Sequence, residues 1–202
     1  MAFHNSGFEA PEELVTESFL LRPIRATDAQ LDYEAVMERK DFLRDWEQTG
    51  WPEDGFTVEG NYQDLARLEE RHSEKRAYTY TVMTQDQKLC LGCVYVMPTD
   101  ASMFSTAKIT ALGEKGWKDF EAAVYFWTRG PRDGSDLNRQ LLECLRHWFT
   151  SDWGFTGVLV VTGELLTEQI QVLEASGLPP LFQIEERDKP DPYLAYGLPG
   201  NH

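Results

Sequence analysis

The sequence has few cysteines and no long apolar run, and each shortage excludes a class of protein. Three cysteines, an odd and sparse count, do not form a disulfide framework and fit a reducing compartment. No run approaches the roughly 18 apolar residues of a membrane-spanning helix. The first residues also lack the basic region and apolar core of a signal peptide. We therefore expect a cytoplasmic protein.

Basic residues are scarce as well. The chain has 19 Lys and Arg against 34 Asp and Glu, a formal net charge of −15 and a pI near 4.6. Sequence-independent nucleic-acid binding needs many contacts from Lys and Arg to phosphate, so nucleic acid is not an expected partner. An anionic membrane surface is excluded on the same ground. Cationic substrates such as amines remain open, although an acidic surface can simply serve solubility.

Cys90 and Cys93 have the C-x-x-C spacing of many metal and redox sites. They fall in an expected strand, where their side chains should point to opposite faces. No second pair of ligands lies nearby to complete a zinc site. We interpret them as two small buried apolar residues and expect no metal.

The length predicts one domain over residues 1–202, with residues 1–15 as a lead-in. Periodicity and turn residues predict strands over 17–24, 77–83, 89–97, 122–128, 156–162, 181–187 and 193–198. They predict helices after residue 27, over 61–75, from residue 137 and over 166–176, the last closed by Gly177. Residues 40–60 show no clear period. Residues 99–118 hold either a short strand near 104–111 or a long excursion.

The stretch over 120–145 combines an apolar strand, a loop of Gly, Pro, Arg and Asp, and an amphipathic helix. Both faces of the strand are apolar, so it should lie inside a sheet. The helix carries an apolar stripe of Leu137, Leu141, Leu142, Leu145, Trp148 and Phe149. Since the first turn of a helix has unpaired N–H groups, the loop and helix start could hold an anion.

Several strings, in this order, resemble the GNAT acyltransferase superfamily. They are LLRPI at 20–24 with Asp28 downstream, CLGCVY at 90–95, AAVYFWTR at 122–129 and EASGL at 174–178. The resemblance spans about residues 16–198. It implies an α/β (α+β) fold with a central, twisted, mixed and mostly antiparallel sheet of about seven strands and helices on both faces.

The resemblance also implies acetyl-CoA as co-substrate. Its pantetheine chain would lie on the backbone of Phe126, Trp127 and Thr128, where the fourth family strand separates from the fifth. Its pyrophosphate would lie on the loop and the first helical turn. The implied phosphate contacts are Arg129, Arg132, Gly134, Ser135, Leu137, Asn138 and Arg139.

The loop departs from the family pattern. Asp133, Asp136 and Asn138 stand where the family has Arg or Gln and two glycines. Repulsion between unit charges about 4 Å apart is on the order of 1 kcal/mol in water and about 4 kcal/mol at an effective dielectric of about 20. Asp136 therefore either opposes a pyrophosphate or, with Ser135 as the alternative, caps the helix. Arg129, Arg132 and Arg139 either bind phosphate by side chain or pair with Asp133 and Asp136.

The catalytic positions are also altered. The family's Glu on the fourth strand aligns with Ala123, the Tyr of the last helix with Leu173, and the Asn before it with Leu166. Glu121, two residues before Ala123, is one candidate base, or an exposed residue at the strand start. Glu164 is a second candidate. The aromatic residues that could form an acceptor pocket, or belong to the core, are Trp46, Trp51, Phe56, Tyr62, Tyr78 and Tyr80.

The first hypothesis is an N-acyltransferase that moves an acetyl or other acyl group from CoA to a small-molecule amine by direct attack. The second is a GNAT fold that has lost CoA binding and serves as a small-ligand binding or interaction module. The third is a structural protein that forms a dimer through the exposed edge of the terminal hairpin.

Overall fold

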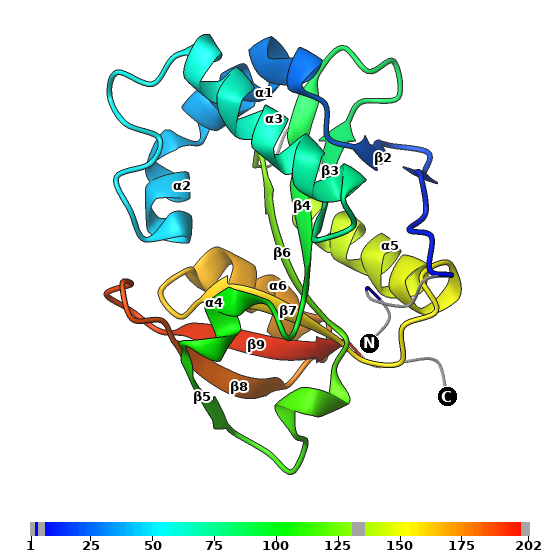
Figure 1. The fold of residues 1–202 in the computed structure, drawn as a ribbon, viewed down its shortest axis with the longest axis vertical. Coiled ribbons are helices and arrows are strands. Elements are labelled where there is room, and N and C mark those ends of the chain that lie inside the picture. The colour runs from blue at the N-terminus through cyan, green and yellow to red at the C-terminus, as the bar shows by residue number, and fades with distance from the viewer. Residues whose placement is uncertain (1–2, 4–6, 131–135, 199–202) are drawn as a thin grey trace.

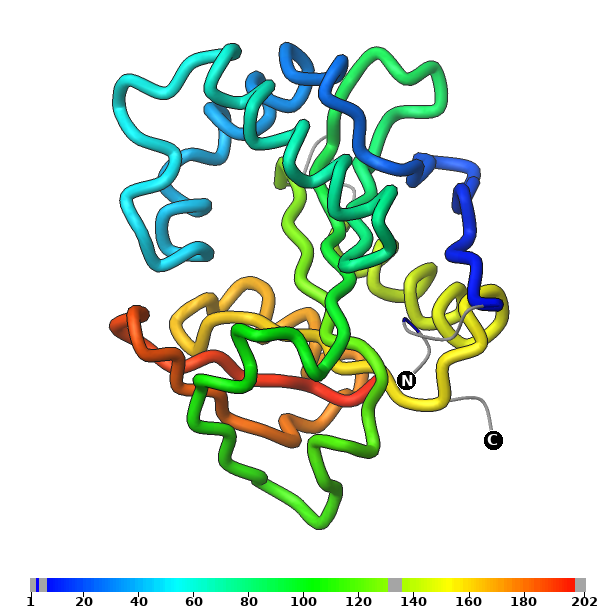
Figure 2. The backbone as a smooth tube through the Cα atoms, viewed as in Figure 1, coloured from blue at the N-terminus to red at the C-terminus, as the bar shows by residue number. Residues whose placement is uncertain are grey.

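The computed structural model describes residues 3, 7–130 and 136–198. Its centre is one sheet of the strands β1 (Leu14–Val15), β2 (Leu20–Pro23), β3 (Tyr78–Met83), β4 (Cys90–Pro98), β5 (Lys108–Ala111), β6 (Ala122–Thr128), β7 (Val158–Gly163), β8 (Pro180–Glu185) and β9 (Tyr193–Leu198). The strand order is β1-β2-β3-β4-β6-β7-β9-β8-β5, and β6 with β7 is the parallel pair among the described strands. The sheet twists strongly, so that β4 and β6 run in a different direction from β7 and β9 (Figures 1 and 2).

The prediction of a mixed, mostly antiparallel sheet is confirmed, but the count of about seven strands is wrong. The described sheet has nine strands. One added strand, β1, lies in the expected lead-in, where its two residues pair with β2. The other, β5, settles the open question over 99–118, because residues 108–111 pair with β8. Within the described sheet, the terminal hairpin of β8 and β9 therefore has no exposed edge through which a dimer could form. β8 lies between β9 and β5, and β9 lies between β7 and β8.

The helices are α1 (Ala29–Glu38), α2 (Lys40–Glu47), α3 (Val58–Ser73), α4 (Ser102–Ser105), α5 (Leu137–Ser151) and α6 (Thr167–Ala175). α2 lies in the segment 40–60, which shows no clear period in the sequence. Only Leu43 and Trp46 of its eight residues are buried, so the apolar periodicity is too short to predict a helix. Gly177 closes α6 with a φ of 74°, the left-handed conformation predicted for it. None of the helices in the described ranges is long and apolar enough to cross a membrane.

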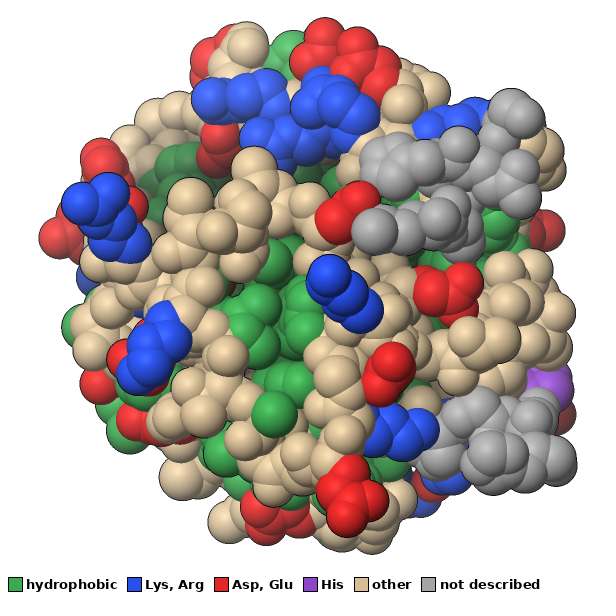
Figure 3. Space-filling view, turned by 60° about the horizontal axis from the view of Figure 1, so that its bottom comes forward, with side chains coloured by type: hydrophobic (Ala, Val, Ile, Leu, Met, Phe, Trp, Pro, Cys, Tyr) green, Lys and Arg blue, Asp and Glu red, His purple; other side chains and the backbone are tan. Residues whose placement is uncertain are grey.

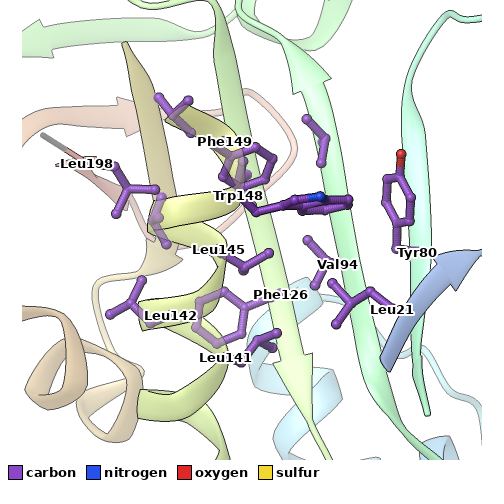
Figure 4. Packing of buried hydrophobic residues seen from close by; sticks show 14 of the residues in the cluster. Leu21, Tyr80, Val94, Phe126, Leu141, Leu142, Leu145, Trp148, Phe149 and Leu198 are labelled. Carbon is purple, nitrogen blue, oxygen red and sulfur yellow. The ribbon is translucent and has the colours of Figure 1, made fainter. Parts of the chain in front are cut away.

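The two faces of the sheet carry separate cores, and β6 contributes to both. Val124 and Phe126 pack with α5, while Ala123, Tyr125 and Trp127 pack on the side of α1, α2 and α3. On the α5 face, Trp148 extends from the helix across β6 toward Tyr80 (Figure 4), with ring centroids 4.9 Å apart. The alternation along β6 therefore separates residues that can meet a ligand on one face from residues that hold α5 on the other.

A bulge at Gly92 corrects the expectation for the two cysteines. Gly92 has a φ of 149°, and the pairing of β4 with β3 shifts register beside it. The extra residue brings both thiols to the same face, where Cys90 Sγ lies 3.7 Å and Cys93 Sγ 3.5 Å from Oδ1 of Asp32. Burial raises the pKa of Asp32, and hydrogen bonds from Asn61 and the two thiols partly oppose that rise. Both cysteines are buried, as predicted, but not on opposite faces.

Candidate functional site

The two central strands separate along their length. β6 and β7 pair over three residues only, from Ala122 opposite Val158 to Val124 opposite Val160. β6 then continues to Thr128 and β7 to Gly163 without further pairing between them. The backbone groups of β6 that face β7 beyond this point are thus open to partners other than a strand.

A side chain of α6 bridges the opening. Gln169 is buried and donates from Nε2 to the carbonyl oxygen of Phe126 at 2.7 Å, while its Oε1 accepts a hydrogen bond from the Thr162 hydroxyl at 2.7 Å. One carboxamide therefore connects β6 with β7 where the strands have parted. The carbonyl of Phe126 at this position is satisfied by an amide N–H, the kind of donor that a pantetheine chain also offers.

A second polar group closes the wider end of the opening. The Thr128 hydroxyl donates to Oδ1 of Asn138 at 2.8 Å, and Nδ2 of Asn138 donates to Glu168 at 3.1 Å. Arg39 of the segment between α1 and α2 lies 3.5 Å from the same Glu168 carboxylate. Asn138, which stands where the resemblance predicts a glycine, is thus a buried structural contact that joins β6, α5 and α6.

The start of α5 decides between the two interpretations of Asp136. Its Oδ1 accepts a hydrogen bond from the backbone N–H of Arg139 at 3.1 Å, so Asp136 is the N-cap of the helix. Arg139 also pairs with Asp136 and Glu143, each at 3.3 Å. A carboxylate therefore uses one of the amides proposed to hold pyrophosphate.

The predicted phosphate-binding arginines are only partly described. Arg129 is engaged inside the protein: its Nε donates to Glu38 at 2.7 Å and its guanidinium to the Cys90 carbonyl at 3.3 Å. Its side chain is 8% exposed, so the structure commits Arg129 to an ion pair and not to an incoming phosphate. Arg132, Asp133, Gly134 and Ser135 lie outside the described residues.

A cavity of about 430 Å³ lies on the opposite face of β6 from α5, beside the opening. Its floor is made by side chains of β4, β6 and β9, and its walls by α2, α3 and the turn between β8 and β9. The lining residues are Trp46, Glu47, Trp51, Asp64, Arg67, Leu68, Arg71, Tyr95, Met97, Met103, Tyr125, Glu186, Lys189 and Tyr193. Its volume lies in the range of small-molecule sites.

The aromatic rings of the cavity form one continuous group. Tyr95 and Tyr125 face each other across β4 and β6. The ring of Trp46 lies 5.7 Å from Tyr95 and 6.3 Å from Tyr125, and Tyr193 lies 6.3 Å from Tyr125. Such rings supply apolar contact area and π faces that attract cations.

Tyr125 is the polar centre of this group. Its hydroxyl has no hydrogen-bond partner among the described residues, although the side chain is buried. Burial raises the pKa of Tyr125 well above its ordinary value, and Glu186, Tyr193 and Glu47 raise it further. The phenol therefore stays protonated and retains a donor for a ligand.

Two carboxylates and one ammonium group lie at the same end of the cavity. Lys189 Nζ lies 3.3 Å from the Glu47 carboxylate and also donates to the Glu47 carbonyl. Burial raises the pKa of Glu186, the nearby Lys189 lowers it and Glu47 raises it again. A carboxylate with a raised pKa is suited to accept a proton from an amine.

The structure brings Trp46 and Trp51 to the cavity, but places two other predicted pocket residues elsewhere. Tyr78 and Tyr80 lie in the core on the α5 face, against Trp148 and Trp153, and therefore cannot line an acceptor site on the other face. Tyr78 and Tyr80 are two residues apart on β3, so both point to the α5 face, and the predicted role in an acceptor pocket does not fit their position. Phe56 contacts Trp51 from outside the cavity, and Tyr62 is 42% exposed.

Both predicted bases lie away from the cavity. Glu121 precedes β6, at the end where the strand pairs with β7, and accepts hydrogen bonds from Thr156 N at 2.6 Å and from its hydroxyl at 3.1 Å. Glu164 accepts from Gln183 at 3.4 Å. Neither residue lines the cavity, so neither is placed to act as a base on a ligand there.

The sequence reasoning missed Tyr125, Glu47 and Glu186. Tyr125 could have been found, because it lies two residues after Ala123 and so on the same face of the strand. Glu47 is the last residue of α2 and Glu186 follows β8, elements far apart in the chain, and no local pattern joins them. Among the described residues, no cluster of His, Cys, Asp and Glu side chains could hold a metal ion.

Comparisons with known proteins give structural neighbours only. No family model matches the sequence, and no curated protein matches it. The solved ribosomal-protein-S5-alanine acetyltransferase of Vibrio fischeri is 16% identical, with a TM-score of 0.66 over 92% of this chain and 94% of that one. RimL, a ribosomal L7/L12 α-N-protein acetyltransferase solved with coenzyme A, is 12% identical, with a TM-score of 0.64 over 91% and 95%.

A third neighbour is the microcin C7 self-immunity acetyltransferase MccE, solved with acetyl-CoA and AMP. It is 9% identical, with a TM-score of 0.67 over 90% of this chain and 92% of that one. At identities of 16%, 12% and 9%, the likeness to these three proteins shows a shared fold and nothing further. The three acetyltransferases thus share the overall fold over nearly the full length of this chain, which has the GNAT fold.

Proposed function

We propose that this protein is an N-acyltransferase that moves an acetyl group from acetyl-CoA to the amine of a small molecule held in the aromatic cavity. The observation that carries the proposal is the position of Tyr125. It lines the cavity, and the next residue on β6, Phe126, offers its carbonyl to the opening between β6 and β7. An acceptor on one side of the strand and an acyl-CoA arm in the opening would therefore be neighbours.

The opening fits an acyl-pantetheine arm. The Phe126 carbonyl accepts an amide N–H from Gln169, and an acyl-pantetheine arm would replace this donor with an amide N–H of its own. Thr128 extends the open side of β6 toward the start of α5. Structural neighbours solved with CoA or acetyl-CoA, among them RimL and MccE, support the same co-substrate. Acetyl-CoA supplies a thioester whose carbonyl carbon an amine can attack.

The residues of the cavity have the properties that this reaction needs. The neutral amine forms a C–N bond with the thioester carbonyl carbon, and the C–S bond breaks. Glu186 would take the proton released by the amine, and Tyr125 would stabilise the departing thiolate by a hydrogen bond. The proton held by Glu186 would then pass to the thiolate, which would leave as the thiol of CoA. Charge is balanced, since one proton leaves nitrogen and one reaches sulfur.

A small acceptor agrees with the shape of the site. The neighbours named above as ribosomal-protein acetyltransferases act on proteins, and a protein N-terminus is the competing acceptor. The cavity is bounded by α2, α3, α4 and the β8–β9 turn, which supports a compact ligand. Incubation with acetyl-CoA and separate pools of small amines and peptides tests this directly. Mass spectrometry should find acetylated small amines; acetylation confined to peptides would contradict the choice.

A second function is favoured by Asp136 and Gln169. Asp136 places a carboxylate at the helix start, and Gln169 holds the carbonyl that an acyl-CoA arm would use. Both contacts support a GNAT fold without CoA binding, in which the aromatic cavity binds a small ligand. Ligand binding without any acetyl-CoA binding would select this function. A cytoplasmic location and a homodimer remain predictions.

A further inference from the structure

We infer that the acceptor is a zwitterion of the amino-acid class, with a free amine, a free carboxylate and an aromatic or large aliphatic side chain. The inference rests on the proposed function for its amine, and on the charges of the cavity for its carboxylate. These charges are divided between two walls of the cavity, one formed by α2 with the β8–β9 turn and the other by α3.

One wall is acidic. It carries two acidic side chains, Glu47 and Glu186, and one basic side chain, Lys189. The adjoining rings of Trp46 and Tyr125 present π faces. Carboxylates beside aromatic rings attract an ammonium group and orient it. The buried Tyr125 hydroxyl, which has no partner in the described residues, supplies a further polar contact here.

The other wall, on α3, is basic. It carries Asp64, Arg67 and Arg71. Arg67 pairs with Asp64 at 2.8 Å, which neutralises both. The guanidinium of Arg71 has no hydrogen bond or ion pair with the residues in the described ranges, and is free to bind a carboxylate in a bidentate manner. The wall therefore has an unmatched positive charge in a protein whose net charge is −15.

The lining between the walls is apolar. Leu68, Met97, Met103 and Tyr95 contribute to it. Hydrophobic side chains also lie in hollows of the face shown in Figure 3, with acidic and basic groups at their borders. A ligand with an ammonium group at one end, a carboxylate at the other and an apolar side chain between them would match the acidic wall, the basic wall and the apolar lining.

The charges also decide between related amines. A diamine would place its second cation against Arg71, which repels it. An arylalkylamine has no carboxylate and would leave Arg71 without a partner, and the N-terminus of a peptide would bring an amide in place of a carboxylate. A free amino acid satisfies both walls at once.

Three matched probes test the inference. They are L-phenylalanine, L-phenylalaninamide, in which an uncharged amide replaces the carboxylate, and 2-phenylethylamine, in which a hydrogen atom replaces it. Acetyl transfer is measured as kcat/KM, and binding in the absence of acetyl-CoA by tryptophan fluorescence or calorimetry. The wild type should prefer phenylalanine to either analogue by about tenfold or more, since a hydrogen-bonded charged group contributes about 1.5–3 kcal/mol.

The variant Arg71→Gln should lose this preference while 2-phenylethylamine reacts and binds as before. Arg76→Gln is the control: Arg76 pairs with Glu74 outside the cavity, and its removal should leave the preference intact. Equal use of all three probes by the wild type, or equal losses for all three in Arg71→Gln, would overturn the inference.

The binding measurement separates this inference from the proposed function. Preferential binding of phenylalanine without acetyl transfer would support the zwitterion site and contradict the transferase. Transfer to 2-phenylethylamine and phenylalaninamide in preference to phenylalanine would support the transferase and contradict the zwitterion site.

Discussion

Nε2 of Gln169 lies 2.7 Å from the carbonyl oxygen of Phe126, in the opening where β6 parts from β7. The proposed acyl-CoA arm needs the same carbonyl, so the side chain and the ligand compete. In Gln169→Ala the affinity for acetyl-CoA should rise several-fold. Folding stability should fall by about 1–3 kcal/mol, because the Thr162 hydroxyl and the Phe126 carbonyl lose a buried partner.

Calorimetry with acetyl-CoA and urea unfolding measure the two effects of Gln169→Ala. Gln140→Ala, on the partly buried side of α5, controls for the loss of a carboxamide elsewhere. Loss of acetyl-CoA affinity in Gln169→Ala would mean that Gln169 helps to bind the co-substrate and does not compete with it.

Asp136 caps α5 and places a negative charge at the expected pyrophosphate site. Asp136→Ser keeps a capping oxygen and removes the charge, so stability should change little while acetyl-CoA affinity rises. Relief of a repulsion on the order of 1 kcal/mol corresponds to about fivefold. Asp136→Ala should lose about 1 kcal/mol of stability. Equal affinities of wild type and Asp136→Ser, compared at low ionic strength, would show that no phosphate approaches this residue.

Glu186 is predicted to accept the amine proton. Burial raises its pKa, so the protonated, inactive form persists to higher pH than for an ordinary Glu. Activity of the wild type should therefore rise with pH as Glu186 ionises, with a midpoint above the usual Glu range. Glu186→Gln should lower kcat by about 100-fold. Its pH–activity profile should also lose the rise caused by Glu186 and keep only the rise caused by deprotonation of the amine. Glu185→Gln, an exposed neighbour on β8, should behave as wild type.

The strand–loop–helix of residues 120–145 shows how far the sequence leads. Its two-sided apolar strand coincides with β6, and its Leu stripe packs on that strand as expected. Tertiary pairing decides what the local pattern leaves open: Lys108–Ala111 is a strand because β8 lies beside it, and Leu14–Val15 because β2 does. Such short, weakly periodic segments carry no signal of their own.

The candidate site was harder to predict because it joins distant segments. Trp46 and Trp51 were proposed for a pocket and line it, whereas Tyr80, equally aromatic, faces α5. Nearness in sequence to Ala123 favours Glu121 as a base, yet its carboxylate accepts hydrogen bonds from Thr156. Glu47 and Glu186 meet only after the chain has folded, so neither could be singled out from composition or spacing.

Gly92 is predicted to be a structural requirement of β4. A Cβ atom added there would lie 2.1 Å from the Trp127 carbonyl oxygen, and its φ of 149° is rare for other residues. Gly92→Ala should cost about 1–3 kcal/mol of stability through crowding, with backbone strain in addition. Gly113→Ala, where an added Cβ meets nothing within 4 Å, is the control. Urea unfolding measures both; an unchanged midpoint for Gly92→Ala would contradict the close approach of β4 and β6.

The central claim is that acetyl-CoA binds in the opening between β6 and β7, next to the Tyr125 cavity. Isothermal titration of the whole chain with acetyl-CoA tests it without knowledge of the acceptor. We expect one-to-one binding with a micromolar Kd, tightened in Asp136→Ser and in Gln169→Ala. Absence of heat at millimolar acetyl-CoA in the wild type and in both variants would contradict the claim and leave the aromatic cavity as a ligand site without transfer.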